Sequence, residues 1–284
     1  MALKKPAKAP RLTNLKILEL ARERGYFVSK VPKSRSGLKF KTDLKRWNGD
    51  TYKFAVISCT HLGSKYQQLT ALNSFYSLCA RSGITTVFHC GDIVDGEHMW
   101  RGHEYDIFAL GADAQIKYAV KSYPKIRGMQ TKIISGNHDL SFWNRSGINV
   151  VESICRQRPD FEYLGDNYAL GSVAGMKIGL MHAMGGVPYA RSYKPQKIVE
   201  QLAPEQKPNL LFIGHWHVPV IVPAYRNVEV VSLGCFQAQT PFLTRLGLQP
   251  VVSGLIVEFK KDSRGLASVK YQWIPFYKRI KNDY

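Results

Sequence analysis

The sequence predicts an α/β protein with a metal site, and two patterns carry this prediction. From Tyr52 onward, short apolar runs of strand type alternate with longer stretches of helical spacing, as in layered α/β folds. The early apolar runs end in residue types that bind metals, and strand carboxyl ends in open α/β sheets converge on one ligand site. The composition, 45% hydrophobic and 21% charged over 284 residues, is that of a globular chain able to bury a sizeable core.

The first 49 residues are predicted to form a small basic appendage, and residues 50–284 the main domain. Residues 1–46 contain 14 Lys and Arg against 3 Asp and Glu, within a formal net charge of +19 for the chain. Disorder is expected over residues 1–10 and a helix over 12–24, and the runs FVSKV and LKFKT flank a PKSRSG turn as in a hairpin. The appendage can either bind nucleic acid or cover one edge of the main sheet, and the sequence leaves both alternatives open.

Five predicted strands bring candidate ligands together. These strands span residues 53–58, 85–90, 131–136, 176–182 and 209–214. Helices are expected near 67–81, 105–122, 146–157 and 195–202, and later strands near 228–233, 253–260 and 268–274. The ends of the five strands carry Cys59-Thr60-His61, Gly91-Asp92, Gly136-Asn137-His138-Asp139, His182 and Gly214-His215-Trp216-His217. Five of the eight histidines in the chain lie at these ends, which favours a shared metal site over five separate structural roles.

These residue types have a chemical rationale. A carboxylate such as that of Asp92 can bridge two divalent ions about 3.5–4 Å apart, a spacing that suits in-line attack on phosphorus. Neutral imidazoles and an amide oxygen complete the coordination and leave net positive charge for a phosphate. The glycines Gly91, Gly136 and Gly214 permit tight turns that aim the ligands inward.

The ordered series resembles the calcineurin-like metallophosphoesterase superfamily, whose pattern is DxH, GD, GNHD, H and GHxH, over residues 53–235. This resemblance implies a four-layer αββα sandwich in which the later strands join a second sheet. It implies that one metal is held by Cys59, His61, Asp92 and His217, and a second by Asp92, Asn137, His182 and His215. It further implies that a bridging hydroxide is the nucleophile, that His138 protonates the leaving group or steadies the transition state, and that Asp139 orients His138.

Cys59 departs from the family pattern, which has Asp at this position. Cys59 either ligates as a thiolate, which favours softer ions such as zinc or iron, or does not ligate and leaves the first metal weak or absent. Ligation is favoured because every other ligand is present. Two divalent ions are therefore expected, with Mn²⁺ preferred and Zn²⁺ or Fe admitted by Cys59.

Several residues outside the ligand set are assigned either a structural role or contact with the substrate. His89 lies within a strand and is assigned a structural role. Candidates for substrate contact lie in loops near the strand ends; they are His98, Arg101, His103, Tyr189 and Arg191.

The site predicts hydrolysis of a phosphate ester but leaves the substrate open. A phosphodiesterase or nuclease acting on nucleic acid, with DNA favoured, fits the clustered positive charge. A phosphomonoesterase uses the same motifs, and Cys59 alone suggests a third alternative, a nucleic-acid-binding protein with a degenerate site. No apolar run approaches the ~20 residues of a membrane span, no signal-peptide pattern follows the N-terminus, and the five scattered cysteines form no CxxC. We therefore expect a cytoplasmic protein without a membrane partner, whose oligomeric state the sequence leaves open.

Overall fold

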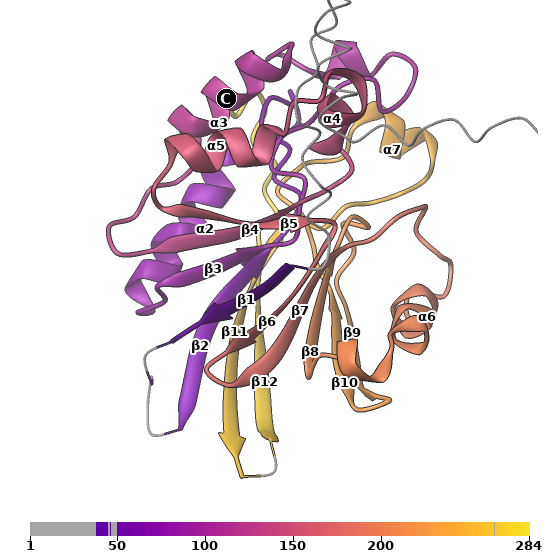
Figure 1. Ribbon diagram of the computed structural model, residues 1–284. Helices are drawn as coiled ribbons and strands as arrows, with labels where there is room; N and C mark the ends of the chain where they lie inside the picture. The colour runs from indigo at the N-terminus through magenta and orange to yellow at the C-terminus, as the bar shows by residue number, and fades with distance from the viewer. Residues whose placement is uncertain (1–37, 45, 47–49, 264) are drawn as a thin grey trace, which may run out of the picture. The chain divides into compact units, whose positions relative to one another are not determined.

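Two six-stranded sheets form the frame of the protein (Figure 1). The computed structural model describes residues 38–44, 46, 50–263 and 265–284. In spatial order, sheet B contains β12 (Gly265–Pro275), β11 (Ser253–Asp262), β2 (Thr51–Ile57), β3 (Thr86–His89), β4 (Gln130–Ser135) and β5 (Phe161–Asp166). Strands β2 to β5 are parallel, whereas β11 and β12 extend the sheet in antiparallel pairing.

The other sheet is assembled largely from later parts of the chain. Sheet A contains, in spatial order, β1 (Leu38–Thr42), β6 (Tyr168–Val173), β7 (Met176–His182), β8 (Leu210–Gly214), β10 (Val228–Ser232) and β9 (Val220–Tyr225). Strands β7, β8 and β10 are parallel, and β1 pairs in parallel with β6 at one edge. Antiparallel pairs β6–β7 and β9–β10 complete the sheet.

Helices cover the outer faces of both sheets. Helices α2 (Leu69–Arg81), α3 (Ala112–Ser122) and α5 (Val150–Gln157) pack on sheet B, and α6 (Tyr193–Gln201) packs on sheet A. Shorter helices lie in the connections, namely α4 (Leu140–Ser146), α7 (Pro241–Arg245), η1 (His103–Asp106) and η2 (Pro204–Gln206). The order helix, sheet, sheet, helix confirms the predicted αββα sandwich. The expectation that all the later strands join a second sheet is wrong, because β11 and β12 extend the sheet of β2 to β5 and only β10 lies in the other sheet.

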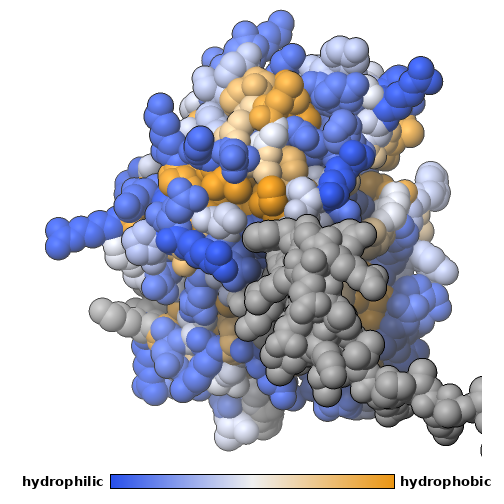
Figure 2. Space-filling model, turned by 45° about the horizontal axis from the view of Figure 1, so that its top comes forward, coloured by the Kyte–Doolittle hydropathy of each residue, from blue (hydrophilic) through white to orange (hydrophobic). Residues whose placement is uncertain are grey.

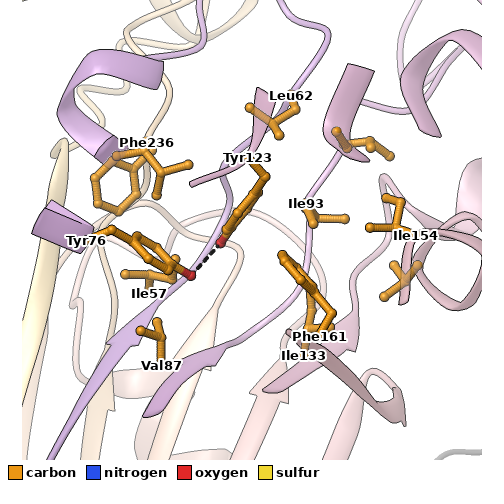
Figure 3. Packing of buried hydrophobic residues seen from close by; sticks show 14 of the residues in the cluster. Ile57, Leu62, Tyr76, Val87, Ile93, Tyr123, Ile133, Ile154, Phe161 and Phe236 are labelled. Atoms are coloured by element: carbon orange, nitrogen blue, oxygen red, sulfur yellow. Dashed lines mark hydrogen bonds between the residues drawn. The ribbon is translucent and has the colours of Figure 1, made fainter. Parts of the chain in front are cut away.

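Three clusters of buried apolar residues lie between the four layers and hold them together. Between sheet B and its helices, Tyr76 of α2 and Tyr123 after α3 place their hydroxyl oxygens 3.0 Å apart within a cluster of buried aliphatic residues (Figure 3). Between the sheets, the ring of Phe54 lies 5.3 Å from that of Phe88 and 5.8 Å from that of Phe212, so β2, β3 and β8 meet in one aromatic contact. Because β3 and β8 are buried along their whole length, they read as unbroken apolar runs, as parallel strands covered on both faces do.

Some elements differ from the sequence-based expectation. Strands β5, β6 and β9 were not predicted; β9 contains Pro223, which weakens the strand pattern and is tolerated at the edge where β9 lies. The expected helix over 105–122 begins only at Ala112, after Gly111 with a φ of 88°. The expected helix over 146–157 begins only at Val150, as α5, while α4 was not predicted and ends before Gly147, whose φ is 69°.

Strand β1 lies within the segment that was predicted to form the basic appendage. Residues LKFKT were expected as one strand of a basic hairpin, and the structure pairs Leu38–Thr42 with β6 instead. This pairing matches the alternative in which part of the segment covers a sheet edge. The other hairpin strand and the helix over 12–24 lie outside the described residues, so the extent of the appendage stays a prediction.

The last described residues fasten the start of α2. Gln68, at the N-cap of α2, makes no capping bond to that helix; its side chain instead bonds both ways with the backbone of Ile280. Asp283 supplies the missing cap, because its carboxylate accepts hydrogen bonds from the backbone nitrogen and the hydroxyl of Thr70 at 2.8 and 2.6 Å. An element near residue 70 is therefore completed by a residue 213 positions later.

Two further expectations can be compared with the described part of the chain. None of its helices is both long and apolar enough to cross a membrane. All five cysteines are free thiols, as their scattered spacing predicted.

Candidate metal centre

The carboxyl ends of five strands, drawn from both sheets, surround one point. From sheet B, β2 leads into Cys59 and His61, β3 into Asp92, and β4 into Asn137 and His138. From sheet A, β7 ends at His182 and β8 leads into His215 and His217. All these side chains except His138 were predicted metal ligands, and the structure brings them together as the strand order implied.

The first group of donors centres on two facing imidazoles. The Nε2 atoms of His61 and His217 lie 3.2 Å apart. One donor atom each of Cys59, His61 and His217 lie within 4.8 Å of one another. The backbone nitrogen of His215 donates to Cys59 Sγ at 3.3 Å, which places the sulfur inside the cluster.

The second group centres on Asp92. His182 Nε2 lies 3.0 Å from Asp92 Oδ2 and 2.9 Å from Asn137 Oδ1. His61 Nε2 lies 4.0 Å from the same oxygen of Asp92, so this carboxylate stands between the two groups. That position is the one a bridging carboxylate would need.

Backbone strain is concentrated on these residues. Twelve described residues other than glycine have a positive φ, and five of them are predicted ligands: Cys59, His61, Asp92, His215 and His217. A positive φ is uncommon for side chains other than glycine and costs about 1–3 kcal/mol. Five of the seven predicted ligands thus lie on strained backbone, which is a frequent feature of functional sites.

Two glycines allow the loops to approach closely. A Cβ on Gly136 would lie 2.3 Å from Asp92 Oδ1, and one on Gly91 would lie 2.6 Å from His182 Nδ1. Both distances are too short for any side chain. Gly91 also has a φ of 85°, so its expected role in a tight turn has a structural basis.

The protonation states suit a metal. Burial lowers the pKa of His217 well below its usual value and that of His215 to about 4, so both imidazoles are neutral and free to ligate near pH 7. Burial alone would raise the pKa of Asp92, but the neighbouring His182 and His138 hold it well below the usual range. Buried neutral imidazoles, a carboxylate, an amide oxygen and a sulfur form a donor set that fits one or two divalent ions.

Cys59 needs a cation to ionise. Burial and the charge of Asp92 raise the pKa of its thiol well above the ordinary value. A coordinated metal ion reverses that preference and holds the thiolate. The structure thus places Cys59 where a ligand would lie, and its ligation stays a prediction.

His138 is held by a hydrogen bond to Asp95, which was not among the predicted site residues. The ring of His138 lies edge-on to that of His61, with centroids 4.5 Å apart, and its Nδ1 donates to the backbone oxygen of Asp95 at 2.5 Å. The buried carboxylate of Asp95 also contacts His61 Nδ1 at 3.0 Å and His103 Nε2 at 3.2 Å. The signal in the sequence was an acidic residue three positions after Asp92, in the run Gly91-Asp92-Ile93-Val94-Asp95.

Asp139 makes different contacts from those predicted. It was expected to orient His138, but its carboxylate accepts hydrogen bonds from the backbone nitrogens of Asp92, Ile93, Val94 and Gly136 at 2.8 to 3.3 Å. The loops after β3 and β4 leave these four amides without strand partners, and a buried carboxylate satisfies them. Asp139 therefore joins two ligand-bearing loops, while Asp95 holds His138.

The candidates for substrate contact differ in their exposure. His98, Arg101, Tyr189 and Arg191 are exposed, whereas His103 is completely buried and bonded to Asp95 behind the cluster. None of the five lines the cavity beside the metal ligands. Their contact with substrate stays a prediction for the four exposed side chains, and His103 supports Asp95 instead.

This fold and donor arrangement define the class of protein. The model of the calcineurin-like phosphoesterase superfamily domain matches residues 52–245. The chain therefore belongs to the calcineurin-like phosphoesterase superfamily, which confirms the resemblance seen in its motifs.

Individual relatives are more distant. The chain is 27% identical over 199 residues to a protein named DNA polymerase II small subunit from Archaeoglobus fulgidus, in a match that covers 59% of this chain and 40% of the relative. A protein of the same name from Methanocaldococcus jannaschii is 26% identical over 193 residues, covering 56% of this chain and 32% of the relative. This chain thus spans less than half the length of these curated relatives. Among solved structures, Vps29 from Chaetomium thermophilum covers 82% of this chain and all of its own at 14% identity and a TM-score of 0.42.

Proposed function

We propose that this protein is a metal-dependent phosphodiesterase that cleaves nucleic acid, with DNA favoured. The observation that carries the proposal is the convergence of predicted ligands from both sheets around the carboxylate of Asp92. Such a centre suits phosphate ester hydrolysis, because a phosphate bridged by two cations has its charge neutralised on both sides.

The proposed ligand sets are those that the superfamily motifs imply. Cys59, His61, Asp92 and His217 would hold one ion, and Asp92, Asn137, His182 and His215 the other. When bound, the two ions would supply an activated water and electrostatic stabilisation of the phosphate. Mn²⁺ is the preferred ion of the proposal, with Zn²⁺ or Fe favoured where Cys59 contributes its thiolate.

His138 is proposed as the proton donor to the leaving oxygen. Its Nδ1 is committed to the backbone oxygen of Asp95, so Nε2 is the nitrogen available to a substrate. Burial lowers the pKa of His138 to about 4, and the negative charge of a bound phosphate would favour the protonated imidazole. Removal of a general acid of this kind typically slows a reaction by about 100-fold or more.

Nucleic acid is the proposed substrate for reasons of charge and lining. The chain carries a formal net charge of +19, which attracts a polyanion. None of the described residues that line the cavity beside the ligands is Lys or Arg, which fits a singly charged diester better than the doubly charged monoester of the alternative reading. The relatives named DNA polymerase II small subunit also suggest a nucleic-acid setting.

The decisive experiment measures cleavage of labelled single- and double-stranded DNA and RNA with Mn²⁺, Mg²⁺, Zn²⁺ or a chelator. Cleavage that the chelator abolishes, and that falls about 100-fold or more in His138→Ala, is expected. Tyr277→Ala is the matched control, because this side chain is 92% exposed and does not line the cavity. Hydrolysis of a small phosphomonoester without cleavage of any strand would contradict the proposal and support the phosphatase alternative.

A second candidate is a non-hydrolysing subunit of a nucleic-acid-processing assembly, which the names of the relatives favour. It predicts that the purified protein binds DNA yet hydrolyses no ester with any divalent ion. The same experiment separates the two candidates once DNA binding is measured in parallel.

A further inference from the structure

A cavity of about 360 Å³ opens beside the candidate metal centre. One of its walls is polar and consists of predicted ligands and His138; they are His61, Asp92, Asn137, His138, His215 and His217. The remaining wall is mostly apolar, with Trp100, Val187, Trp216, Phe242, Leu243 and Leu248 among its residues. A phosphate held at the polar wall would therefore bring its ester substituent against an apolar surface.

The apolar wall is fixed by the fold. Thr240 caps α7 through a hydrogen bond from the backbone nitrogen of Leu243 at 3.2 Å, and the backbone nitrogen of Leu248 returns to the oxygen of Leu243 at 2.9 Å. The backbone nitrogen of Val251 donates to the oxygen of His217 at 2.9 Å, so the segment after α7 is tied to the ligand-bearing loop after β8. The wall thus stands in a set position relative to the reacting phosphate.

Aromatic rings give this wall a stacking surface. The rings of Trp100 and Phe242 are nearly parallel, at 9° with centroids 4.4 Å apart. Trp100 is also in contact with the imidazole of His103, at 4.0 Å between centroids, so it is packed between two rings. Phe242, half-buried at the edge of this stack, lines the cavity together with Trp100 and Trp216.

The surface around the cavity contains exposed hydrophobic side chains. Met184 and Leu246, which line the cavity, are 69% and 54% exposed. Figure 2 shows exposed hydrophobic residues gathered among hydrophilic ones on the face that the top of Figure 1 presents when it is turned forward. Large apolar side chains left exposed around an opening of this kind mark a binding site.

We propose that this cavity is a subsite for one unpaired nucleobase next to the scissile phosphate. The inference rests on the proposed function and names the form of nucleic acid that the centre accepts. A planar ring with polar edges fits an apolar aromatic wall that also presents the side-chain amide of Gln249. The volume of about 360 Å³ lies within the range of ligand pockets, about 300 to 1,000 Å³, and has room for a base. Inside a duplex both faces of a base are covered by its stacked neighbours, so only a base outside the stack can lie against this wall. The base must therefore leave its partner, as in enzymes that act on extruded or single-stranded nucleotides.

The test compares a single-stranded oligonucleotide with a second one in which an abasic analogue replaces the nucleoside next to the cleaved phosphate. The wild type is expected to cleave the intact strand about tenfold faster or more, because base stacking on an aromatic residue is lost in the analogue. Phe242→Ala should remove this preference, Phe242→Trp should keep it, and Tyr277→Ala should match the wild type. Duplex DNA should be cleaved more slowly than the same strand alone.

Three outcomes would overturn the inference. Equal cleavage of the intact and abasic strands by the wild type would remove the base subsite while leaving the nuclease function intact. Unchanged discrimination in Phe242→Ala would show that the base lies elsewhere. Hydrolysis of a long-chain alkyl phosphodiester without cleavage of any nucleic acid would overturn both proposals and assign the cavity to an aliphatic chain.

Discussion

At the scale of single residues, the predicted ligands combine strain with burial. Cys59 illustrates this, because its φ of 55° and complete burial place a thiol where the family pattern has a carboxylate. The pKa of this thiol is raised by burial and by the negative charge of Asp92. Its chemistry therefore depends on a cation.

The first prediction concerns Cys59 as a ligand. Co²⁺ bound to the wild type should give a thiolate-to-cobalt charge-transfer band in the near ultraviolet, because sulfur donates to the ion. Cys59→Asp should bind Co²⁺ without that band, and Cys59→Ala should bind it more weakly. Absorption titration of the three proteins, with Cys155→Ala as the control, measures this. A band that survives in Cys59→Asp would show that Cys59 is not a ligand.

The second prediction uses His89, which was assigned a structural role. Burial lowers its pKa from 6.5 to about 3, so below pH 6.5 the unfolded chain binds the proton more readily than the folded protein. The buried imidazole therefore leaves the free energy of unfolding unchanged above pH 6.5. As the pH falls from 6.5 toward 3, the group lowers that free energy by up to about 1.4 kcal/mol per pH unit. Urea unfolding of the metal-free wild type and His89→Leu between pH 7 and 4 should show that the wild type loses more stability over this range. Parallel pH profiles would contradict the shift.

At the scale of elements, the sequence predicted where five strands end but did not predict every strand of the two sheets. The ends of β2, β3, β4, β7 and β8 could be predicted because each is marked locally by an apolar run that leads into a residue of a metal-binding type. Strands β5 and β6 could not, because each is only six residues long, contains a glycine, and is separated from the other by Asn167 alone. Strand β5 is held by β4, and β6 lies between β1 and β7, and no local pattern in the sequence encodes these pairings.

The third prediction concerns α2. Asp283→Ala should lower the free energy of unfolding by about 1 kcal/mol, because Thr70 loses the acceptor for its backbone nitrogen and the helix loses a negative charge at its start. Urea denaturation at pH 7 measures the difference. Lys281→Ala, an exposed neighbour, serves as the control and should leave stability unchanged. Equal midpoints for Asp283→Ala and the wild type would show that Gln68 and Ile280 hold this end of the helix without it.

At the scale of the whole molecule, the candidate centre joins the two sheets. Its ligands come from three strands of sheet B and two of sheet A, so a bound ion would link layers that otherwise meet through apolar packing. The convergence of the proposed ligands could be predicted from short motifs, whereas the contacts of Asp95 and Asp139 could not. Those contacts depend on how closely the loops after β3 and β4 approach, which no local pattern encodes.

The fourth prediction follows from this link. Mn²⁺ or Zn²⁺ at about 100 times its dissociation constant should stabilise the folded protein by about 2.7 kcal/mol, since the unfolded chain lacks the assembled site. Asp92→Asn should lose most of this gain because the carboxylate that stands between the two donor groups is removed. Thermal unfolding with and without a chelator gives the comparison. An equal metal-induced shift in both proteins would place the ions elsewhere.

The hydrogen bonds between Thr70 and Asp283 also limit the order in which parts of the fold can form during synthesis. Strand β2 pairs with β11, and the start of α2 waits for residues more than 200 positions downstream, so sheet B cannot close while the chain is still short. Contacts this distant in sequence slow the search for the native state. The edge of β2 that pairs with β11 therefore remains without its partner until the later residues have been synthesised, and an unpaired strand edge of this kind would be a target for a chaperone.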